Sequence, residues 1–278
     1  MEFQMPIREQ NSNKGTFGKV LNVSGSKNYI GAAYLSSLAV LKIGAGYVTL
    51  ASGKNIIKSV SALLPETVFL SRFNALKNLD KYNVLLIGCG LGQTYWSKYW
   101  FKKFIKKSQN LTLPVVIDAD GLNILSLNSE DKEILRFAQN DNKILIITPH
   151  PVEAARLLGT KVNDILDDAE NSAKELSKKY KCVTVLKIHR TIICSKDAEI
   201  YVNEHGNSAL AKAGTGDVLA GCIAGLLAQK MFPFEAAKLG VYLHSRAGEI
   251  ASEDLTEYSV LASELINYLP NAIKEINQ

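Results

Sequence analysis

Short β-branched runs alternate along this chain with longer segments of helical period, and this alternation constrains the fold more than any other feature. The runs at 84–87 and 144–147 are apolar throughout, which is typical of strands buried on both faces of a parallel sheet. Strands bounded by glycine and separated by helices form βαβ units. The sequence therefore predicts an α/β fold, with a mostly parallel central sheet and helices on both of its faces. The expected strands are 19–23, 47–51, 68–70, 84–87, 115–117, 144–147, 182–186, 191–194 and 199–202.

The predicted helices occupy the longer segments between these strands. The stretch from 182 to 202 differs, because its three short runs are separated only by breaks at His189-Arg190 and at 195–198. This spacing indicates a short antiparallel meander at the edge of the sheet. The polar segment 139–143 is predicted to be a loop. The expected helices are 32–43, 94–107, 151–158 and 164–180, followed by three more between 218 and the end.

Length and charge narrow the class of protein further. A chain of 278 residues supports one large core, so we expect a single domain over 18–278 after a polar lead-in over 1–17. The formal charge of +5 is mild, and the basic residues are spread along the chain. The lysines between 98 and 107 recur at helical spacing, which favours the solvated face of an amphipathic helix over a nucleic-acid patch. A mild positive excess also suits anionic small-molecule substrates.

The four cysteines and the apolar stretches indicate where the protein works. Cysteines at wide, irregular intervals without a Cys-x-x-Cys pair argue against a zinc cage and a redox dithiol, and favour a reducing cytoplasm. The first 15 residues lack the basic-then-apolar pattern of a secretion signal. The longest apolar stretch, 218–228, is too short to cross a bilayer, so no membrane role is predicted.

The strongest motif is the glycine-rich turn Ala-Gly-Thr-Gly-Asp at 213–217, which directly precedes that apolar stretch. Its two glycines permit a tight turn with bare N–H groups at the positive end of a buried helix. Such a turn can cradle a phosphoryl group, and Asp217 can accept a proton from an attacking hydroxyl. Aspartate is also a routine N-cap residue, so spacing alone leaves the catalytic and the capping roles of Asp217 open.

A second glycine-rich loop, Gly-Cys-Gly-Leu-Gly at 88–92, follows the run 84–87 directly. A dinucleotide-binding fingerprint needs glycine where Gln93 stands and an acidic residue about 20 positions later, and neither condition is met. The loop therefore predicts either a close approach of backbone to some ligand or a plain turn after the strand. No G-x-x-x-x-G-K-[ST] phosphate loop occurs in the sequence, which excludes a P-loop ATPase.

Polar side chains also follow two other predicted strands. His150 and Glu153 come after the run 144–147, where ligands gather in this class of fold, so a functional role is favoured for both. Pro151 between them is expected to open a helix. Asp118 and Asp120 follow the run 115–117. They either orient a substrate or a hydrated Mg²⁺, or serve as turn and cap residues before the stretch 122–127, and both interpretations stay open.

In their order along the chain, these motifs resemble those of the ribokinase-like superfamily, and more narrowly those of the ADP- or ATP-dependent NAD(P)H-hydrate dehydratase family. The resemblance runs from about residue 18 to residue 270. The stretches that carry it are Asn22-Val-Ser-Gly-Ser with Tyr29-Ile-Gly-Ala-Ala, Ile87-Gly-Cys-Gly-Leu-Gly-Gln, Val116-Ile-Asp-Ala-Asp-Gly-Leu-Asn, Thr148-Pro-His-Pro-Val-Glu-Ala-Ala-Arg-Leu-Leu-Gly, Val185-Leu-Lys, Gly206-Asn-Ser-Ala-Leu-Ala-Lys-Ala-Gly-Thr-Gly-Asp and Val241-Tyr-Leu-His.

The resemblance implies a lyase that repairs nicotinamide cofactors which have taken up water. The enzyme would phosphorylate the ring hydroxyl of NADH hydrate or NADPH hydrate from ADP or ATP. Phosphate would then leave as the ring nitrogen supplies electrons, which restores the reduced cofactor. This route is chemically reasonable because hydroxide is a poor leaving group and phosphate is a good one. The alternatives are a kinase of the same superfamily, acting on a vitamin or sugar hydroxymethyl group, and a nucleotide-binding module without catalysis.

Site residues follow from the same resemblance. Asp217 would be the base, and the amides of Gly214, Thr215 and Gly216 would form the anion hole. Glu153 would help to position Mg²⁺, which would be held largely through water and phosphates. The implied substrate contacts are Ala32, Gly90, Gly92, His150 and Asp217, and the implied nucleotide contacts are Lys187, Ile188, His189, Arg190, Thr191 and Gly216.

Some positions depart from the family's usual pattern. Ile188 stands where glycine usually follows the lysine, which puts a branched side chain near the expected nucleotide. Cys89 replaces a usual proline, Val152 a usual glycine, and His205 a common threonine. Relatives form homo-oligomers, which we also expect here. Many carry an N-terminal epimerase domain, for which about 17 residues are far too few, so a separate epimerase or a longer parent chain is expected.

Overall fold

The computed structural model describes residues 3–127 and 143–276, and its strands confirm the predicted α/β class. In these two segments nine strands form one sheet in the order β3-β2-β1-β4-β5-β6-β7-β8-β9. The pairs from β3 through β7 are parallel, and β8 and β9 are antiparallel, which confirms the predicted edge meander. The strands are β1 (Lys19–Val23), β2 (Tyr47–Ser52), β3 (Val68–Ser71), β4 (Val84–Ile87), β5 (Val115–Ile117), β6 (Leu145–Ile147), β7 (Val183–Leu186), β8 (Ile192–Cys194) and β9 (Ile200–Val202).

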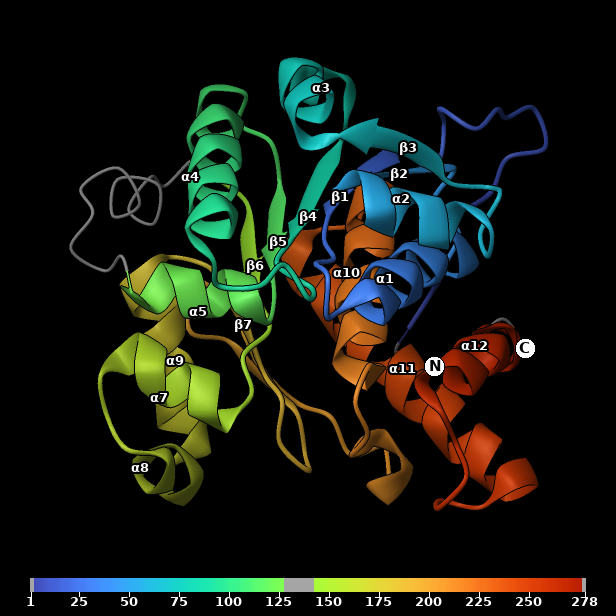
Figure 1. The fold of residues 1–278 in the computed structure, drawn as a ribbon. Helices are drawn as coiled ribbons and strands as arrows, with labels where there is room; N and C mark the ends of the chain where they lie inside the picture. The colour runs from blue at the N-terminus through green and yellow to red at the C-terminus, as the bar shows by residue number, and fades with distance from the viewer. Residues whose placement is uncertain (1–2, 128–142, 277–278) are drawn as a thin grey trace.

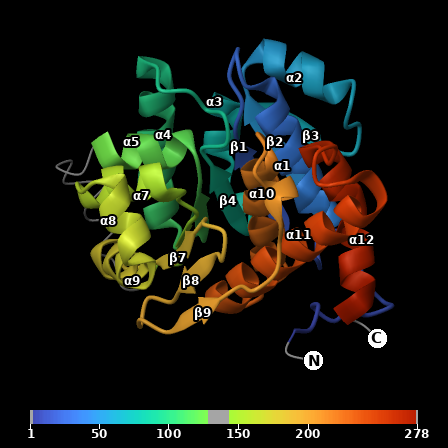
Figure 2. The same ribbon diagram turned by 90° about the horizontal axis from the view of Figure 1, so that it is seen from below.

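Helices cover both faces of the sheet, as Figure 1 shows. One face carries α1 (Ile30–Lys42), α10 (Thr215–Ala228), α11 (Pro233–Leu255) and α12 (Ala262–Ile276). The opposite face carries α4 (Tyr95–Asn110), α5 (Asp120–Leu127), α7 (Pro151–Leu158), α8 (Val162–Asp167) and α9 (Ala169–Tyr180). Viewed from below, the two groups remain on opposite sides (Figure 2). The short helices α2 (Lys54–Ser61) and α3 (Arg72–Lys77) flank β3 in the chain.

Several helix boundaries differ from the sequence-based expectation. The helix expected over 164–180 is divided at Asp168, whose side chain accepts the Asn171 N–H (3.2 Å) and so caps a new helix, α9. Helix α10 begins at Thr215 rather than at 218. The prediction omits α2, α3 and α5, which are only six to eight residues long. Apart from residue 143, the loop expected over 139–143 lies outside the described residues.

The strand order reverses between β1 and β4, which makes this the switch point of the sheet. From β1 the chain moves outward to β2 and β3, then returns to the other side of β1 as β4. The loops after β1 and β4 therefore diverge, and ligands of open α/β sheets bind where such loops part. The two loops touch at their bases, since the Gly25 N–H donates to the Cys89 carbonyl (2.9 Å) and a Cβ on Gly90 would lie 2.6 Å from the Tyr29 Cβ.

The lead-in before β1 is also attached to the body of the protein. The Phe3 side chain is buried, and its ring stacks on the Tyr242 ring of α11 with centroids 4.8 Å apart. The Arg8 guanidinium lies over the Phe17 ring and donates to the Gly44 carbonyl (2.8 Å). Among the described helices, none is long and apolar enough to cross a bilayer.

Candidate active site

Asp217 lies in the first turn of α10, at the carboxyl-end edge of the parallel strands. The residue before the helix, Gly214, is its N-cap and has a φ of 95°, a backbone conformation that favours glycine. A Cβ at this position would lie 2.7 Å from Leu35 Cδ1 of α1. Since the helix begins at Thr215, Asp217 is its third residue and not its N-cap. The capping interpretation of Asp217 is therefore wrong.

The turn before Asp217 is held by hydrogen bonds from both sides. The Thr215 hydroxyl donates to the carbonyls of Leu210 and Lys212 (2.8 Å each). The Thr215 carbonyl lies 2.9 Å from Nε2 of His244, a buried residue of α11. Burial lowers the pKa of His244 to about 4, so its imidazole is neutral near pH 7 and Nε2–H donates to that carbonyl. The first-turn N–H groups of Gly216 and Asp217 have no acceptor within the helix and can receive an anion.

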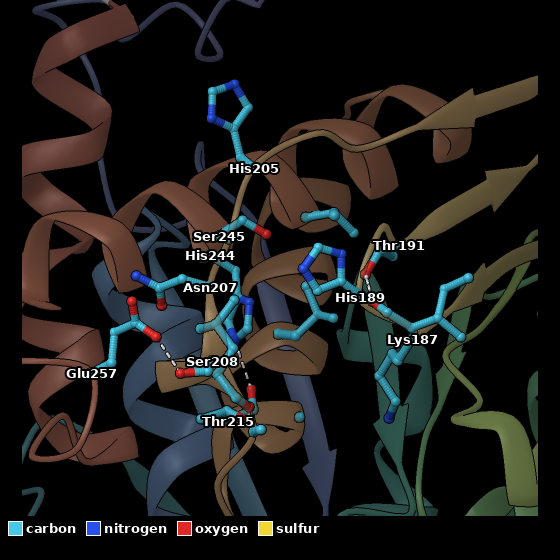
Figure 3. Close-up of a pocket in the computed structure, with 17 residues that line it drawn as sticks. Lys187, His189, Thr191, His205, Asn207, Ser208, Thr215, His244, Ser245 and Glu257 are labelled. Atoms are coloured by element: carbon cyan, nitrogen blue, oxygen red, sulfur yellow. Dashed lines mark hydrogen bonds between the residues drawn. The ribbon is translucent and has the colours of Figure 1, made fainter.

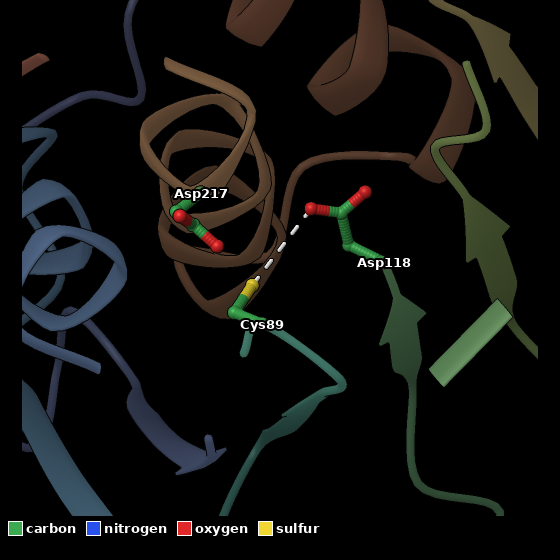
Figure 4. Close-up of side chains that lie close together, drawn as sticks. All are labelled: Cys89, Asp118 and Asp217. Carbon is green, nitrogen blue, oxygen red and sulfur yellow. Dashed lines mark hydrogen bonds between the residues drawn. The ribbon is translucent and has the colours of Figure 1, made fainter. Parts of the chain in front are cut away.

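Three side chains from different elements converge at this helix end (Figure 4). Ligand atoms of Cys89, Asp118 and Asp217 all lie within 4.8 Å of one another. Asp118 follows β5, and its Oδ1 accepts from Lys187 Nζ (2.7 Å) and from the Thr148 hydroxyl (2.6 Å). The Asp118 side chain is almost fully buried, so the Lys187 ammonium balances a charge that water hardly reaches. A Cβ on Gly216 would lie 3.5 Å from Lys187 Nζ, so the same ammonium lies beside the start of α10.

The surroundings of Asp217 make it a base suited to neutral pH. Burial, followed by the neighbouring charge of Asp118, raises the pKa of Asp217 to about 7, while Lys187 acts in the opposite direction. Burial, followed by the carboxylates of Asp217 and Asp118, raises the pKa of Cys89 well above its ordinary value, so this residue remains a thiol. A carboxylate with a pKa near the working pH is an effective general base.

His150 and Glu153 form the start of α7, beside Lys187. His150 Nδ1 accepts the N–H groups of Val152 (3.1 Å) and Glu153 (3.3 Å), and Glu153 Oε2 accepts the His150 N–H (2.9 Å). Pro151 occupies the first helical turn, as predicted. Burial, then Lys187, lowers the pKa of His150, and burial raises the pKa of Glu153. Both residues therefore cap a helix, and the charge of Lys187 in its ion pair with Asp118 acts to lower the pKa of each.

The predicted substrate residues at the β1–β4 switch point lie close together. A Cβ on Gly90 would lie 2.7 Å from the Ala32 Cβ, so backbone and helix meet there at close range. The Gly92 N–H donates to Asp120 Oδ2 (2.7 Å), and Gln93 Nε2 lies 3.3 Å from Asp120 Oδ1. Asp120 therefore holds the glycine-rich loop against the first turn of α5.

A cavity of about 740 Å³ adjoins the start of α10 (Figure 3). Six of the predicted site residues line it, namely Lys187, Ile188, His189, Thr191, Thr215 and Gly216. Arg190 is not among the lining residues, and its guanidinium pairs instead with Glu204 at the surface. Sequence reasoning missed His205, Asn207, Ser208, His244, Ser245 and Glu257, which also line the cavity. Asn207, Ser208 and His244 lie in two of the stretches that carry the family resemblance, 206–217 and 241–244, so these stretches could have indicated them.

The expected role of Glu153 in positioning Mg²⁺ can be compared with its hydrogen bonds. Mg²⁺ takes oxygen ligands and retains several of its waters. Glu153 Oε2 bonds the His150 N–H, and Oε1 lies 3.4 Å from His150 Nε2. A direct metal bond would compete with this cap, but each oxygen keeps a further lone pair for a metal-bound water. The residues present therefore fit a magnesium ion held through water.

A mostly parallel sheet, with an aspartate at a helix start beside a cavity, is the arrangement found here, and ribokinase-like proteins share the fold. The structure is similar to that of a ribokinase-like superfamily protein from Enterococcus faecalis V583, with a TM-score of 0.86 and 28% identity over 98% of this chain and 92% of that one. The sequence model of the NAD(P)H-hydrate dehydratase family matches residues 20–271. The chain therefore belongs to the NAD(P)H-hydrate dehydratase family.

Individual relatives agree with this placement. The chain is 39% identical to an ADP-dependent (S)-NAD(P)H-hydrate dehydratase from Neisseria meningitidis, over 88% of this chain and 81% of the relative. It is 37% identical to a bifunctional NAD(P)H-hydrate repair enzyme from Moorella thermoacetica, over 99% of this chain and 53% of the relative, so it spans about half of that protein. An ADP/ATP-dependent NAD(P)H-hydrate dehydratase from Bacillus subtilis, co-crystallised with ATP and Mg²⁺, has a TM-score of 0.85 and 30% identity over 98% and 94% of the two chains.

Proposed function

We propose that this protein uses ADP or ATP to dehydrate NADH hydrate and NADPH hydrate, which restores the reduced cofactors. One observation carries the proposal: a carboxylate whose pKa is raised to about 7 lies at the start of α10, next to a cavity of about 740 Å³. The names of the Neisseria and Bacillus relatives support the same reaction and the same nucleotides.

In this proposal the nucleotide occupies the cavity and directs its phosphates toward α10. The amides of Gly216 and Asp217 and the Lys187 ammonium would receive the negative charge, because they lie at the positive end of the helix dipole. Lys187, Ile188, His189 and Thr191 contribute one wall of the cavity. Ile188 also packs against the core of the α4 face. When bound, Mg²⁺ would neutralise phosphate charge, and Glu153 would hold one of its waters.

The first chemical step transfers a phosphoryl group to the hydrate. Asp217 accepts the proton of the ring hydroxyl while that oxygen attacks the terminal phosphorus of the nucleotide. The bond from phosphorus to the bridging oxygen breaks, which leaves AMP from ADP or ADP from ATP. The N–H groups of Gly214 and Gly216 in the predicted anion hole stabilise the charge that develops on the transferring oxygens. The Thr215 N–H already donates to the Lys212 carbonyl (3.4 Å).

The second step expels the phosphate. The carbon–oxygen bond breaks as the lone pair of the ring nitrogen moves into the ring, and the neighbouring ring carbon then loses a proton. The products are phosphate and the reduced nicotinamide. We assign Ala32, Gly90, Gly92 and His150 to hold the ring, because the first three lie at the β1–β4 switch point and His150 faces the central ion pair.

The test starts from chemically hydrated NADH. The hydrate is incubated with the protein, Mg²⁺ and either ADP or ATP, and the absorbance of the reduced ring and the release of phosphate are followed together. We expect both to rise in parallel, and neither to rise without nucleotide. No recovery with either nucleotide would overturn the proposal. A stable phosphorylated product without released phosphate would favour the kinase alternative.

An epimerase activity follows from the same proposal. We propose that an epimerase, on a separate chain or in a longer parent chain, interconverts the two hydrate epimers, and that the chain itself self-associates. The bifunctional relatives are about twice as long as the part that this chain matches, which leaves room in them for a second activity. Recovery from an epimer mixture should stop when one epimer is consumed and resume when an epimerase is added. Light scattering measures the number of subunits.

We place this reaction in the cytoplasm and in a single domain over 18–278. The four cysteines are buried thiols, which suits a reducing compartment. The family match begins and ends close to the proposed domain limits.

A further inference from the structure

Cys89 is buried at the centre of the candidate site and has no role in the steps above. It follows Gly88 in the loop after β4, and its exposed fraction is 0%. Its carbonyl accepts the Gly25 N–H (2.9 Å), which fixes the backbone and so the direction of the side chain. In Figure 4 the sulfur points toward the space between the two carboxylates.

The sulfur contacts the oxygen of Asp118 that the ion pair leaves open. Asp118 Oδ1 is occupied by Lys187 and Thr148, whereas Oδ2 lies 3.8 Å from the Cys89 sulfur. Asp217 lies in the same group, within 4.8 Å. The thiol donates to Asp118 Oδ2, and the same thiol lowers the pKa of Asp217, whose carboxylate adjoins it. The S–H group is a weak donor, so it can turn between the two carboxylates.

We propose that Cys89 is a positioning residue for the proposed dehydration: its thiol donates to Asp217 and keeps this carboxylate ionised and directed at the substrate hydroxyl. The inference rests on the proposed function. A thiol suits this place because it supplies a donor without adding charge to a group that already holds two carboxylates and one ammonium. An alanine at position 89 would remove the donor that faces Asp217, whereas a serine would retain one.

The effect of the thiol on the pKa of Asp217 can be separated from the effects of the other groups around it. Asp118 and Asp120 raise the pKa of Asp217, and Lys187 lowers it, as does the Cys89 hydrogen bond. From α11, His244 is neutral near pH 7. The part of α1 that meets α10 offers the Ser36 carbonyl and the small Ala39 side chain. Substitution of Cys89 by alanine or serine adds or removes none of these charges, and Asp118 keeps its bonds from Lys187 and Thr148.

The first experiment compares pH profiles of kcat/KM for Cys89→Ala and Cys89→Ser. We expect the acid limb of Cys89→Ala to move to higher pH by ~0.5 to 1 unit, since a hydrogen bond to the ionised form is lost, and Cys89→Ser to restore it. Cys222→Ala is the matched control, because Cys222 is equally buried on the same helix as Asp217 and its pKa is raised by burial alone. An equal loss in all three variants with unmoved acid limbs would overturn the proposal.

The second experiment does not depend on turnover. The infrared S–H stretching band of Cys89, isolated as the difference between the wild-type protein and Cys89→Ala, should shift as the pH crosses about 7. The same band should stay fixed in Asp217→Asn. A band that does not respond in the wild-type protein overturns the proposal. A responding band in a protein that fails to restore NADH would instead contradict the proposed function and leave the hydrogen bond established.

Discussion

The two faces of the sheet are packed in different ways. On the face of α1 and α10 the helices meet through glycine, since a Cβ on Gly221 would lie 2.5 Å from the Ser36 carbonyl oxygen and one on Gly225 would lie 2.2 Å from Ile43 Cγ2. On the opposite face α4 inserts Phe101 and Phe104, both with 0% exposure. Helices α1 and α10 thus approach each other closely at glycines, whereas the space under α4 is filled by large side chains.

This difference in packing suggests that the α10 face positions the site residues and the α4 face stabilises the fold. Helix α10 carries Asp217 and the amides beside it, and its backbone contact with α1 fixes where these groups point. Large buried rings contribute more hydrophobic free energy each, so α4 contributes stability. Changes on the α10 face should therefore alter activity most, and changes on the α4 face should alter stability most.

Replacing Asp217 by asparagine should have the largest effect. We expect kcat to fall by about 10³-fold, because a general base contributes 10²- to 10⁴-fold. The folded protein holds the Asp217 proton more tightly than the unfolded chain, since the pKa is raised from 3.8 to about 7. Ionisation therefore destabilises the fold progressively as the pH rises through that window. Above pH 7, the free energy of unfolding of Asp217→Asn should therefore exceed that of the wild-type protein by about 2 to 4 kcal/mol. Steady-state kinetics and thermal unfolding at two pH values test both outcomes.

Phe104→Ala tests the α4 face. Removing a fully buried ring should lower the free energy of unfolding by about 3 to 5 kcal/mol. At a temperature where the variant is still folded, kcat should stay within about twofold of the wild-type value. Denaturant unfolding gives the first quantity and initial rates give the second. A large fall in kcat of the folded variant would break the proposed division between the faces.

Gly221→Ala tests the α1–α10 contact. The new methyl group would meet backbone, which cannot rotate away, so we expect a loss of about 1 to 3 kcal/mol in stability. Because the helix must move, kcat should fall by a larger factor than in Phe104→Ala despite the smaller change in stability. Gly31→Ala on α1 is the stability control, since a Cβ there meets nothing within 4 Å. Equal destabilisation of both glycine variants would contradict the packing argument.

The pH profile of the unaltered protein tests the base on the α10 face without any substitution. In the proposed mechanism Asp217 accepts a proton only when it is ionised, and burial raises its pKa to about 7. The value of kcat/KM should therefore fall about tenfold for each pH unit below 7. A profile that stays flat down to pH 5 would mean that another group accepts the proton.

The sequence allowed the sheet to be predicted well and the site only in part. The inner strands β4, β5 and β6 could be predicted because strands buried on both faces leave a continuous apolar signal. The partly buried edge strands β3 and β9 were predicted from short β-branched runs between breaks. The start of α10 was placed too late, because the conformation of Gly214 decides it and composition does not reveal φ. The pair of Asp118 and Lys187, separated by 69 positions, was not predicted as a pair. Only the assembled sheet brings the ends of β5 and β7 together.

The stacking of Phe3 on Tyr242 has a practical consequence for work on this protein. Tyr242 also meets the His205 imidazole edge-to-face at 4.9 Å, and His205 belongs to the wall of the cavity. An affinity tag fused at the amino end would thus lie next to a row of aromatic rings that reaches the cavity proposed to hold the nucleotide. Binding constants for ADP and ATP should be taken from untagged protein, or from protein tagged at the other end.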